Sequence, residues 1–172
     1  MTVEKIYLDM DGVLADFKRG VEELCHMSAS DQNAQDSEAN KEEDNKMWDS
    51  IRGIPHFYDK LHLMPGAKEM FDALYGKYGK RCEILTKLPS TGRKIRDAGE
   101  DKKNWVKRLL SEEVKVNIVQ DEDKNKYCNN KYCILIDDSI ENIEKWEGMG
   151  GTGIKYESHD ETMKKLGELQ IL

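Results

Sequence analysis

Residues 7–17, YLDMDGVLADF, contain the pattern that is most informative about the fold. An apolar run rich in β-formers, residues 3–8, leads into this stretch and stops abruptly at Asp9. Asp9 and Asp11 follow the run two residues apart, and Gly12 permits a tight turn directly after them. Open α/β sheets bind ligands at the carboxyl ends of their strands. The pattern therefore predicts a strand that delivers two carboxylates into a ligand-binding crevice.

Short apolar runs and helical patterns alternate along the rest of the chain. Further strands are expected at residues 81–85, 114–119, 132–136 and 152–156. Apolar residues at helical spacing predict helices over residues 67–78, 105–110, 140–146 and 162–169, the first of them announced by Pro65-Gly66. Continuous apolar strands that alternate with helices are typical of a parallel sheet covered on both faces. We therefore predict an α/β fold with a Rossmann-like three-layer core.

The route from the first strand to the second is far longer than an ordinary crossover of about a dozen residues. Its flanks, residues 17–27 and 47–57, are amphipathic, whereas residues 28–46 contain no large apolar side chain. We interpret residues 28–46 as a solvated loop or the exposed side of a helix, with no role beyond connection. The expected organisation is a core of residues 1–15 and 65–172, and a small helical cap of residues 16–64 inserted after the first strand.

The amino-acid composition argues against several classes of binding partner. The 34 acidic residues outnumber the 27 basic ones, for a net charge of -7. This balance argues against a nucleic-acid polymer, because affinity for one rests on neutralising its phosphates. No apolar run approaches the roughly 20 residues of a membrane helix, and the N-terminus has no signal-peptide pattern. The four cysteines lack C-x-x-C spacing, so we expect reduced thiols in a cytoplasmic protein.

A second pair of carboxylates, Asp137 and Asp138, follows the apolar run at residues 134–136. If both carboxylate-bearing strands are central and parallel, four carboxylates converge, together with Asp9 and Asp11. Their mutual repulsion costs stability unless a cation neutralises it. Oxygen ligands beside a phosphate-sized gap suit Mg²⁺, and we predict that ion as the cofactor.

A threonine and a lysine extend the set of polar residues. Thr86 stands at the end of the second apolar run. At about 100° per residue, Lys102 falls at the middle of the apolar stripe of residues 105–110, whereas Lys103 lies roughly 90° away, toward solvent. A lysine on the inward face at the start of a helix needs a negatively charged partner. The alternative is that its stem only covers apolar surface.

Taken together, these motifs resemble those of the haloacid dehalogenase-like (HAD) phosphohydrolases and, more narrowly, of the 5'(3')-deoxyribonucleotidases. The resemblance rests on residues 7–17, 56–67, 100–110 and 134–138, and it spans nearly the whole chain apart from residues 28–46. Three positions depart from the nucleotidase pattern, namely Lys87, Gln120 and Ser139. Because these positions touch phosphate, sugar or base contacts, the reaction type is better determined than the substrate.

The resemblance implies catalytic roles for two of the carboxylates. Asp9 is expected to be the nucleophile that forms an aspartyl-phosphate, and Asp11 the general acid and base. Thr86 and Lys102 are expected to bind the phosphate oxygens.

The metal ligands follow in the same way. Asp9, Asp11 (through its backbone carbonyl) and Asp138 are expected to hold Mg²⁺ directly, and Asp137 to hold bound waters.

The implied activity is the hydrolysis of (deoxy)nucleoside monophosphates to nucleoside and phosphate. We expect pyrimidines to be preferred over purines, because the shortened cap limits the size of the pocket. Four aromatic residues are expected either to line the cap pocket and stack on a base or to fill the cap core: Phe17, Trp48, Phe57 and Tyr58. A phosphatase of another small phosphate ester is one alternative, and a non-catalytic nucleotide- or phosphate-binding module is another. Dehalogenation is disfavoured because it has no use for the acid/base Asp11. The sequence also leaves open whether the protein forms a homodimer.

Overall fold

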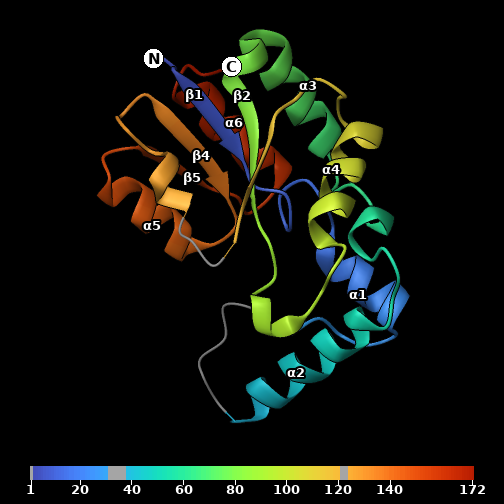
Figure 1. The fold of residues 1–172 in the computed structure, drawn as a ribbon. Helices are drawn as coiled ribbons and strands as arrows, with labels where there is room; N and C mark the ends of the chain where they lie inside the picture. Colours follow the sequence, from blue (N-terminus) through green and yellow to red (C-terminus); the bar gives the residue numbers. More distant parts are fainter. Residues whose placement is uncertain (1, 31–37, 121–123) are drawn as a thin grey trace.

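The computed structural model describes residues 2–30, 38–120 and 124–172. Within these residues, a parallel sheet of five strands has the order β3-β2-β1-β4-β5, so the first strand lies at the centre. The strands are β1 (Lys5–Leu8), β2 (Cys82–Lys87), β3 (Val116–Val119), β4 (Cys133–Asp137) and β5 (Thr152–Lys155). The α/β fold with a parallel sheet is therefore confirmed (Figure 1).

Helices alternate with these strands. The α-helices are α1 (Phe17–Cys25), α2 (Glu38–Arg52), α3 (Ala67–Tyr78), α4 (Ala98–Leu109), α5 (Ile140–Gly148) and α6 (His159–Glu168). Short 3₁₀ turns are η1 (Tyr58–Lys60), η2 (Gly79–Arg81), η3 (Thr91–Arg93) and η4 (Lys124–Tyr127). Among the described residues, every helix is too short or too polar to span a membrane.

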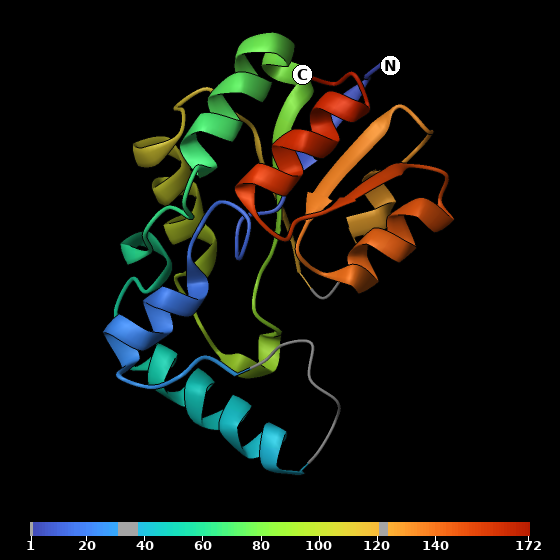
Figure 2. The same cartoon turned by 180° about the vertical axis from the view of Figure 1, so that it is seen from behind.

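The alternation of side chains along each strand divides the core between the two faces of the sheet. Ile6 and Leu8 of β1 belong to a large apolar cluster that includes buried residues of α3, α4 and α6. Tyr7 points to the other face and joins a smaller cluster with Ile143 and Trp146 of α5. Figure 2 shows α6 crossing one face of the sheet in front of β1. Both faces are thus covered, which explains why the strands read as continuous apolar runs.

The starting residues of two helices can be compared with the signals in the sequence. Helix α3 begins at Ala67, directly after Gly66, whose φ of 73° lies in the left-handed region. This start agrees with the Pro65-Gly66 signal. Helix α6 begins at His159, earlier than the apolar spacing indicated, because the Ser158 side chain caps it by accepting a hydrogen bond from the Glu161 amide at 3.3 Å.

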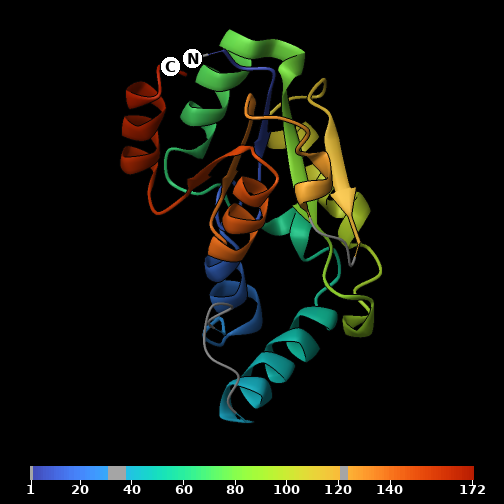
Figure 3. The same cartoon turned by 90° about the vertical axis from the view of Figure 1, so that its left-hand side faces the viewer.

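Helices α1 and α2 lie beyond the carboxyl ends of the strands, and the two termini lie at the opposite end of the sheet (Figures 1 and 3). Buried residues of both helices, Val21, Met47 and Ile51, belong to the same apolar cluster as one face of the sheet. Helix α2 covers the second half of residues 28–46, and its residues before Met47 are mostly exposed. Residues 31–37 of that segment lie outside the described residues. The division into a core and a cap of residues 16–64 stays a prediction.

Candidate active site

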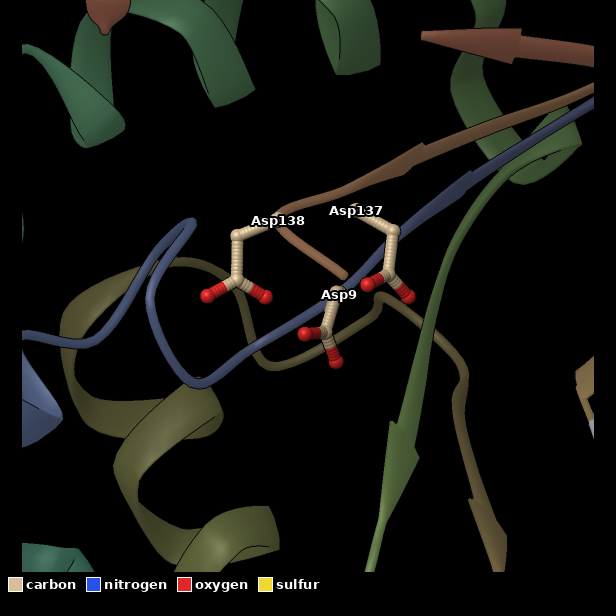
Figure 4. A group of neighbouring side chains, drawn as sticks. All are labelled: Asp9, Asp137 and Asp138. Atoms are coloured by element: carbon tan, nitrogen blue, oxygen red, sulfur yellow. The ribbon is translucent and has the colours of Figure 1, made fainter. Parts of the chain in front are cut away.

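Three of the predicted carboxylates meet at the carboxyl edge of the sheet. Asp9 follows β1, Asp137 is the last residue of β4, and Asp138 comes next. Because β1 and β4 are parallel neighbours, their ends coincide, and oxygens of these three side chains lie within 4.8 Å of one another (Figure 4). Asp11 lies outside this group, so three carboxylates converge closely where the sequence suggested four.

Gly12 allows the two carboxylate-bearing segments to approach each other. Its φ is +83°, and a Cβ placed on it would lie 2.3 Å from Oδ2 of Asp138. A side chain here would therefore strain the backbone and collide with the carboxylate. The glycine in the D-x-D-G pattern is required for close approach as well as for the turn.

Lys124 is a site residue that sequence reasoning missed. Its ammonium donates hydrogen bonds to Oδ1 of Asp9 at 2.6 Å and to Oδ2 of Asp137 at 2.7 Å. The side chain is 2% exposed. The signal in the sequence was weak, a lysine in a polar stretch shortly after the run at residues 114–119. No helical or strand pattern gives that lysine a direction.

The charges of this cluster perturb one another. Burial raises the pKa of Asp9, and Asp137 and Asp138 raise it further, while Lys124 opposes the shift. Burial, followed by the charge of Asp137, raises the pKa of Asp138 to about 6. Burial alone would lower the pKa of Lys124, but the two carboxylates it contacts hold that pKa above its ordinary value. One lysine against three carboxylates leaves an excess of negative charge.

This donor set fits a hard divalent cation. All of the clustered groups are carboxylate oxygens, which Mg²⁺ prefers. Nearby, Oδ1 of Asp11 is buried and has no hydrogen-bond partner among the described residues. A buried carboxylate oxygen without a partner is costly, and a bound group that supplies positive charge or a donor would remove that cost.

Asp137 is held more firmly than the other carboxylates. Besides Lys124, it accepts hydrogen bonds from Nδ2 of Asn142, at 3.1 Å to each oxygen, and from the Ser139 amide at 2.9 Å. Ser139, noted in the sequence as a departure from the nucleotidase pattern, also caps α5 by accepting a hydrogen bond from the Asn142 amide at 3.4 Å. Sequence reasoning did not identify Asn142. Both oxygens of Asp137 are thus engaged within the protein.

A second lysine, Lys102, donates hydrogen bonds to several groups on the other side of the site. Lys102 of α4 is fully buried, and its ammonium donates to Oδ2 of Asp11 at 2.6 Å, to Oγ1 of Thr86 at 2.8 Å and to the carbonyl of Lys87 at 2.7 Å. It also lies 4.7 Å from the centre of the Tyr58 ring. Lys103 instead faces solvent and pairs with an exposed glutamate. The orientation of the two lysines is as the helical spacing predicts.

A cavity of about 360 Å³ opens beside Asp11. Its lining residues are Asp11, Phe17, Asp44, Trp48, Tyr58, Lys87, Leu88, Pro89, Ser90 and Arg93. Three of the four predicted aromatic residues are among them, but Phe57 is not. Phe57 is 1% exposed and packs behind the lining, with its ring centre 5.7 Å from that of Phe17 and 5.3 Å from that of Tyr58. For Phe57, the structure supports the core-filling alternative.

The polar segment before Met47 does more than connect, which corrects the interpretation from composition. Oδ1 of Asp44 accepts hydrogen bonds from Oγ of Ser30 at 2.9 Å and from Nε1 of Trp48 at 3.1 Å. Its other oxygen pairs with Arg93, whose guanidinium lies 5.6 Å from the centre of the Trp48 ring. Asp44 therefore joins helix α2 to the loop after β2 along the wall of the cavity.

A family model described as "5' nucleotidase, deoxy (Pyrimidine), cytosolic type C protein" matches residues 2–165. The chain belongs to this nucleotidase family. The protein is accordingly a phosphoric monoester hydrolase of the 5'-nucleotidase type with a HAD fold, and the family implies a small-molecule nucleotide as its substrate.

Solved structures agree on the fold of this nucleotidase. A HAD-superfamily hydrolase from Ehrlichia chaffeensis is 13% identical with a TM-score of 0.55, and the match covers 99% of both chains. A hydrolase from Streptococcus pneumoniae is 13% identical with a TM-score of 0.54, over 97% of this chain and 100% of the other. A dehalogenase solved with an intermediate complex is 10% identical with a TM-score of 0.54, over 98% and 97%. Among curated proteins, none matches significantly.

Proposed function

We propose that the protein is a Mg²⁺-dependent phosphomonoesterase that hydrolyses deoxyribonucleoside monophosphates through an aspartyl-phosphate. The observation that carries this proposal is the placement of Asp9. It is buried at the carboxyl edge of the central strand, among Asp137, Asp138 and Lys124, and Asp11 beside it lines a cavity of about 360 Å³.

Mg²⁺ would be held by Asp9, Asp138 and the backbone carbonyl of Asp11. Asp137 is already bound to Lys124, Asn142 and the Ser139 amide, which supports a role in which it holds ordered waters. When bound, the ion supplies positive charge that neutralises the carboxylates and the phosphate of the substrate.

Asp9 would act as the nucleophile. Lys124 donates a hydrogen bond to Oδ1 of its carboxylate at 2.6 Å and so positions the carboxylate for attack. The attacking oxygen forms a bond to phosphorus while the bond from phosphorus to the ester oxygen breaks, giving an aspartyl-phosphate. Burial strengthens the electrostatic interactions that hold the carboxylate in place.

Asp11 would serve both half-reactions as general acid and base. Lys102 binds its Oδ2, whereas its buried Oδ1 has no partner among the described residues. In the first step, Asp11 gives a proton to the leaving alcohol. In the second, it takes a proton from the water that attacks phosphorus, and the bond to Asp9 breaks to release inorganic phosphate.

Charge on the transferring phosphoryl group would be stabilised by Thr86 and two lysines. Lys102 already donates to Oγ1 of Thr86, so the hydroxyl is free to turn its own proton toward a phosphate oxygen. Lys102 and Lys124 approach from α4 and η4 respectively. Catalysis of phosphoryl transfer rests on positioning and on electrostatic stabilisation of the transferred group, and fixed cations contribute to both.

The cavity wall supports a nucleotide as substrate. Phe17, Trp48 and Tyr58 give it aromatic surface, and stacking on such surface contributes roughly 1–3 kcal/mol per base. Residues 16–64 would form the cap that supplies this wall. The small volume favours pyrimidine over purine deoxyribonucleotides.

A substrate panel tests the proposal. Release of inorganic phosphate is measured for nucleotides, sugar phosphates and an aryl phosphate, with Mg²⁺ and with a chelator. We expect turnover only with Mg²⁺ and the highest kcat/KM for pyrimidine deoxyribonucleotides. Phe17→Ala should raise KM for nucleotides more than for the aryl phosphate, whereas Tyr132→Ala, which removes an exposed ring elsewhere, should change neither. A sugar phosphate leading by about tenfold would refute the nucleotidase assignment.

One observation favours a second candidate, the phosphatase of another small ester. Lys87 also lines the cavity, as does Arg93, although Arg93 is paired with Asp44. A substrate that carries a second anionic group in place of a neutral base would gain from the charge of Lys87 and would compete with Asp44 for Arg93. The same panel separates the two candidates.

A further inference from the structure

A second cavity, of about 440 Å³, lies next to the substrate cavity. The end of η3 and the residues after it divide the two, since Arg93 lines the substrate cavity and residues 94–97 line the second one. The remaining lining residues are Ile51, Arg52, Ile54, Pro55, His56, Phe57 and Asp101. Figure 3 shows the end of α2 near the segment that follows β2, which is the junction where this cavity lies.

The wall of the second cavity is partly apolar and partly cationic. Ile54, Phe57 and Ile95 are among its apolar residues, and Lys94 and Arg96 are among its cations. The side chains of Lys94 and Arg96 are exposed, and among the described residues neither has an ion-pair or hydrogen-bond partner. The chain as a whole carries a net charge of -7. Two cations that lie two positions apart and have no carboxylate partner therefore make a locally positive region.

The other charges of this cavity are largely accounted for. Arg52 pairs with Asp49 at 2.9 Å. Asp101, almost completely buried, pairs with Nδ1 of His56 at 2.8 Å. Counted over the lining side chains with His56 neutral, the three cations outnumber the two carboxylates by one: Arg52, Lys94 and Arg96 against Asp97 and Asp101. The cavity therefore keeps an excess of positive charge.

We propose that this second cavity binds a nucleoside triphosphate as a regulatory ligand, distinct from the substrate. Its phosphates would contact Lys94 and Arg96, and its base would pack on Ile54 and Ile95, which are only partly buried. A volume of about 440 Å³ lies within the range of about 300–1,000 Å³ that is usual for small-molecule sites. The mixed wall suits a ligand that combines a flat apolar ring with several negative charges. A triphosphate carries more charge than the monoester that the catalytic site is proposed to take.

Two structural links would connect this ligand to catalysis. Nε of Arg52 donates a hydrogen bond at 3.1 Å to the carbonyl of Arg93, and the Arg93 side chain lines the substrate cavity. Phe57 lines the second cavity and packs edge-on against Phe17, which lines the first. A ligand that displaces residues 94–97 or Phe57 would shift the wall that holds the substrate, and so would change KM.

The binding test uses the full chain and ATP. Calorimetric titration should show saturable binding to the wild type and at least tenfold weaker binding to the Lys94→Ala/Arg96→Ala double variant. The matched control is Lys103→Ala/Lys107→Ala, which removes two exposed lysines from the same region of the chain and should bind ATP like the wild type. Absence of binding at about 1 mM ATP, or equal binding to all three proteins, would overturn the proposal.

The activity test separates this cavity from the catalytic site. KM is measured with and without ATP at a fixed free Mg²⁺ concentration. ATP should change KM of the wild type at least twofold, whereas the Lys94→Ala/Arg96→Ala variant should keep its own KM in the presence of ATP. A KM response retained in that variant would place ATP in the catalytic site, and binding without any KM response would exclude regulation; either result overturns the proposal. The calorimetric titration still tests whether ATP binds to this cavity if the protein shows no phosphatase activity.

Discussion

Replacing Lys124 by methionine is the most direct test of how the carboxylate cluster is held together. Methionine keeps an apolar stem but removes the ammonium that donates to Asp9 at 2.6 Å and to Asp137 at 2.7 Å. All three side chains are buried, so water cannot replace the lost bonds. Removing one partner of a buried ion pair costs about 3–5 kcal/mol. Asp137 keeps its bonds from Asn142 and the Ser139 amide, which points to the lower end, about 3 kcal/mol.

The assay is urea unfolding at neutral pH in the presence of a chelator. For a denaturant slope of about 2 kcal/mol/M, a loss of about 3 kcal/mol lowers the unfolding midpoint by about 1.5 M. Lys126→Met is the matched control, because Lys126 belongs to the same 3₁₀ turn but is exposed, and it should stay within about 0.5 kcal/mol of the wild type. If Lys124→Met unfolds at the same urea concentration as this control, the buried lysine does not neutralise the cluster and our electrostatic account is wrong.

Three further predictions use other residues of the site. Asp9→Asn keeps the shape of the side chain but removes the attacking charge, so turnover should fall by several orders of magnitude, and wild-type-like turnover in purified protein would exclude a covalent mechanism. Lys102→Ala should cost about 3 kcal/mol in kcat/KM, whereas Lys103→Ala should be nearly silent; the reverse order would show that the wrong lysine was assigned. The hydrogen bond to Asp101 raises the pKa of His56, so the pair should stabilise the fold fully below about pH 6.5 and lose this effect as the pH rises through the raised pKa. The difference in unfolding free energy between wild type and Asp101→Asn should therefore shrink from acidic to alkaline pH, and a difference that grows would contradict the assignment.

Local patterns in the sequence determined most of the fold. The apolar runs before Asp9 and before Asp137 predict strands of a parallel sheet, because each run is continuous, as in strands buried on both faces, and each is followed by a helix. Helical periodicity likewise separated Lys102 from Lys103, since the direction of a side chain on a helix depends only on its position along that helix. These properties are encoded within a few residues of the chain.

The position of Lys124 depends on contacts between distant parts of the chain. Lys124 lies 115 positions from Asp9 in the sequence, outside any regular strand or α-helix, and its direction depends on how the chain returns to the sheet after β3. This lysine is attracted by two carboxylates that follow or end neighbouring strands, and these carboxylates become close only when β1 and β4 pair. No pattern within a short segment can represent that attraction.

Packing also decided which aromatic and polar residues face the substrate cavity. Phe17 and Phe57 are equivalent in the sequence, as apolar rings in amphipathic flanks, but one lines the cavity and the other packs behind it. Asp44 looked like one more solvated charge in a polar segment, yet it binds Trp48 and pairs with Arg93, which follows a different strand. Composition describes the average environment of a segment. The neighbours of one side chain are set by the elements that close over it, and those come together only in the folded chain.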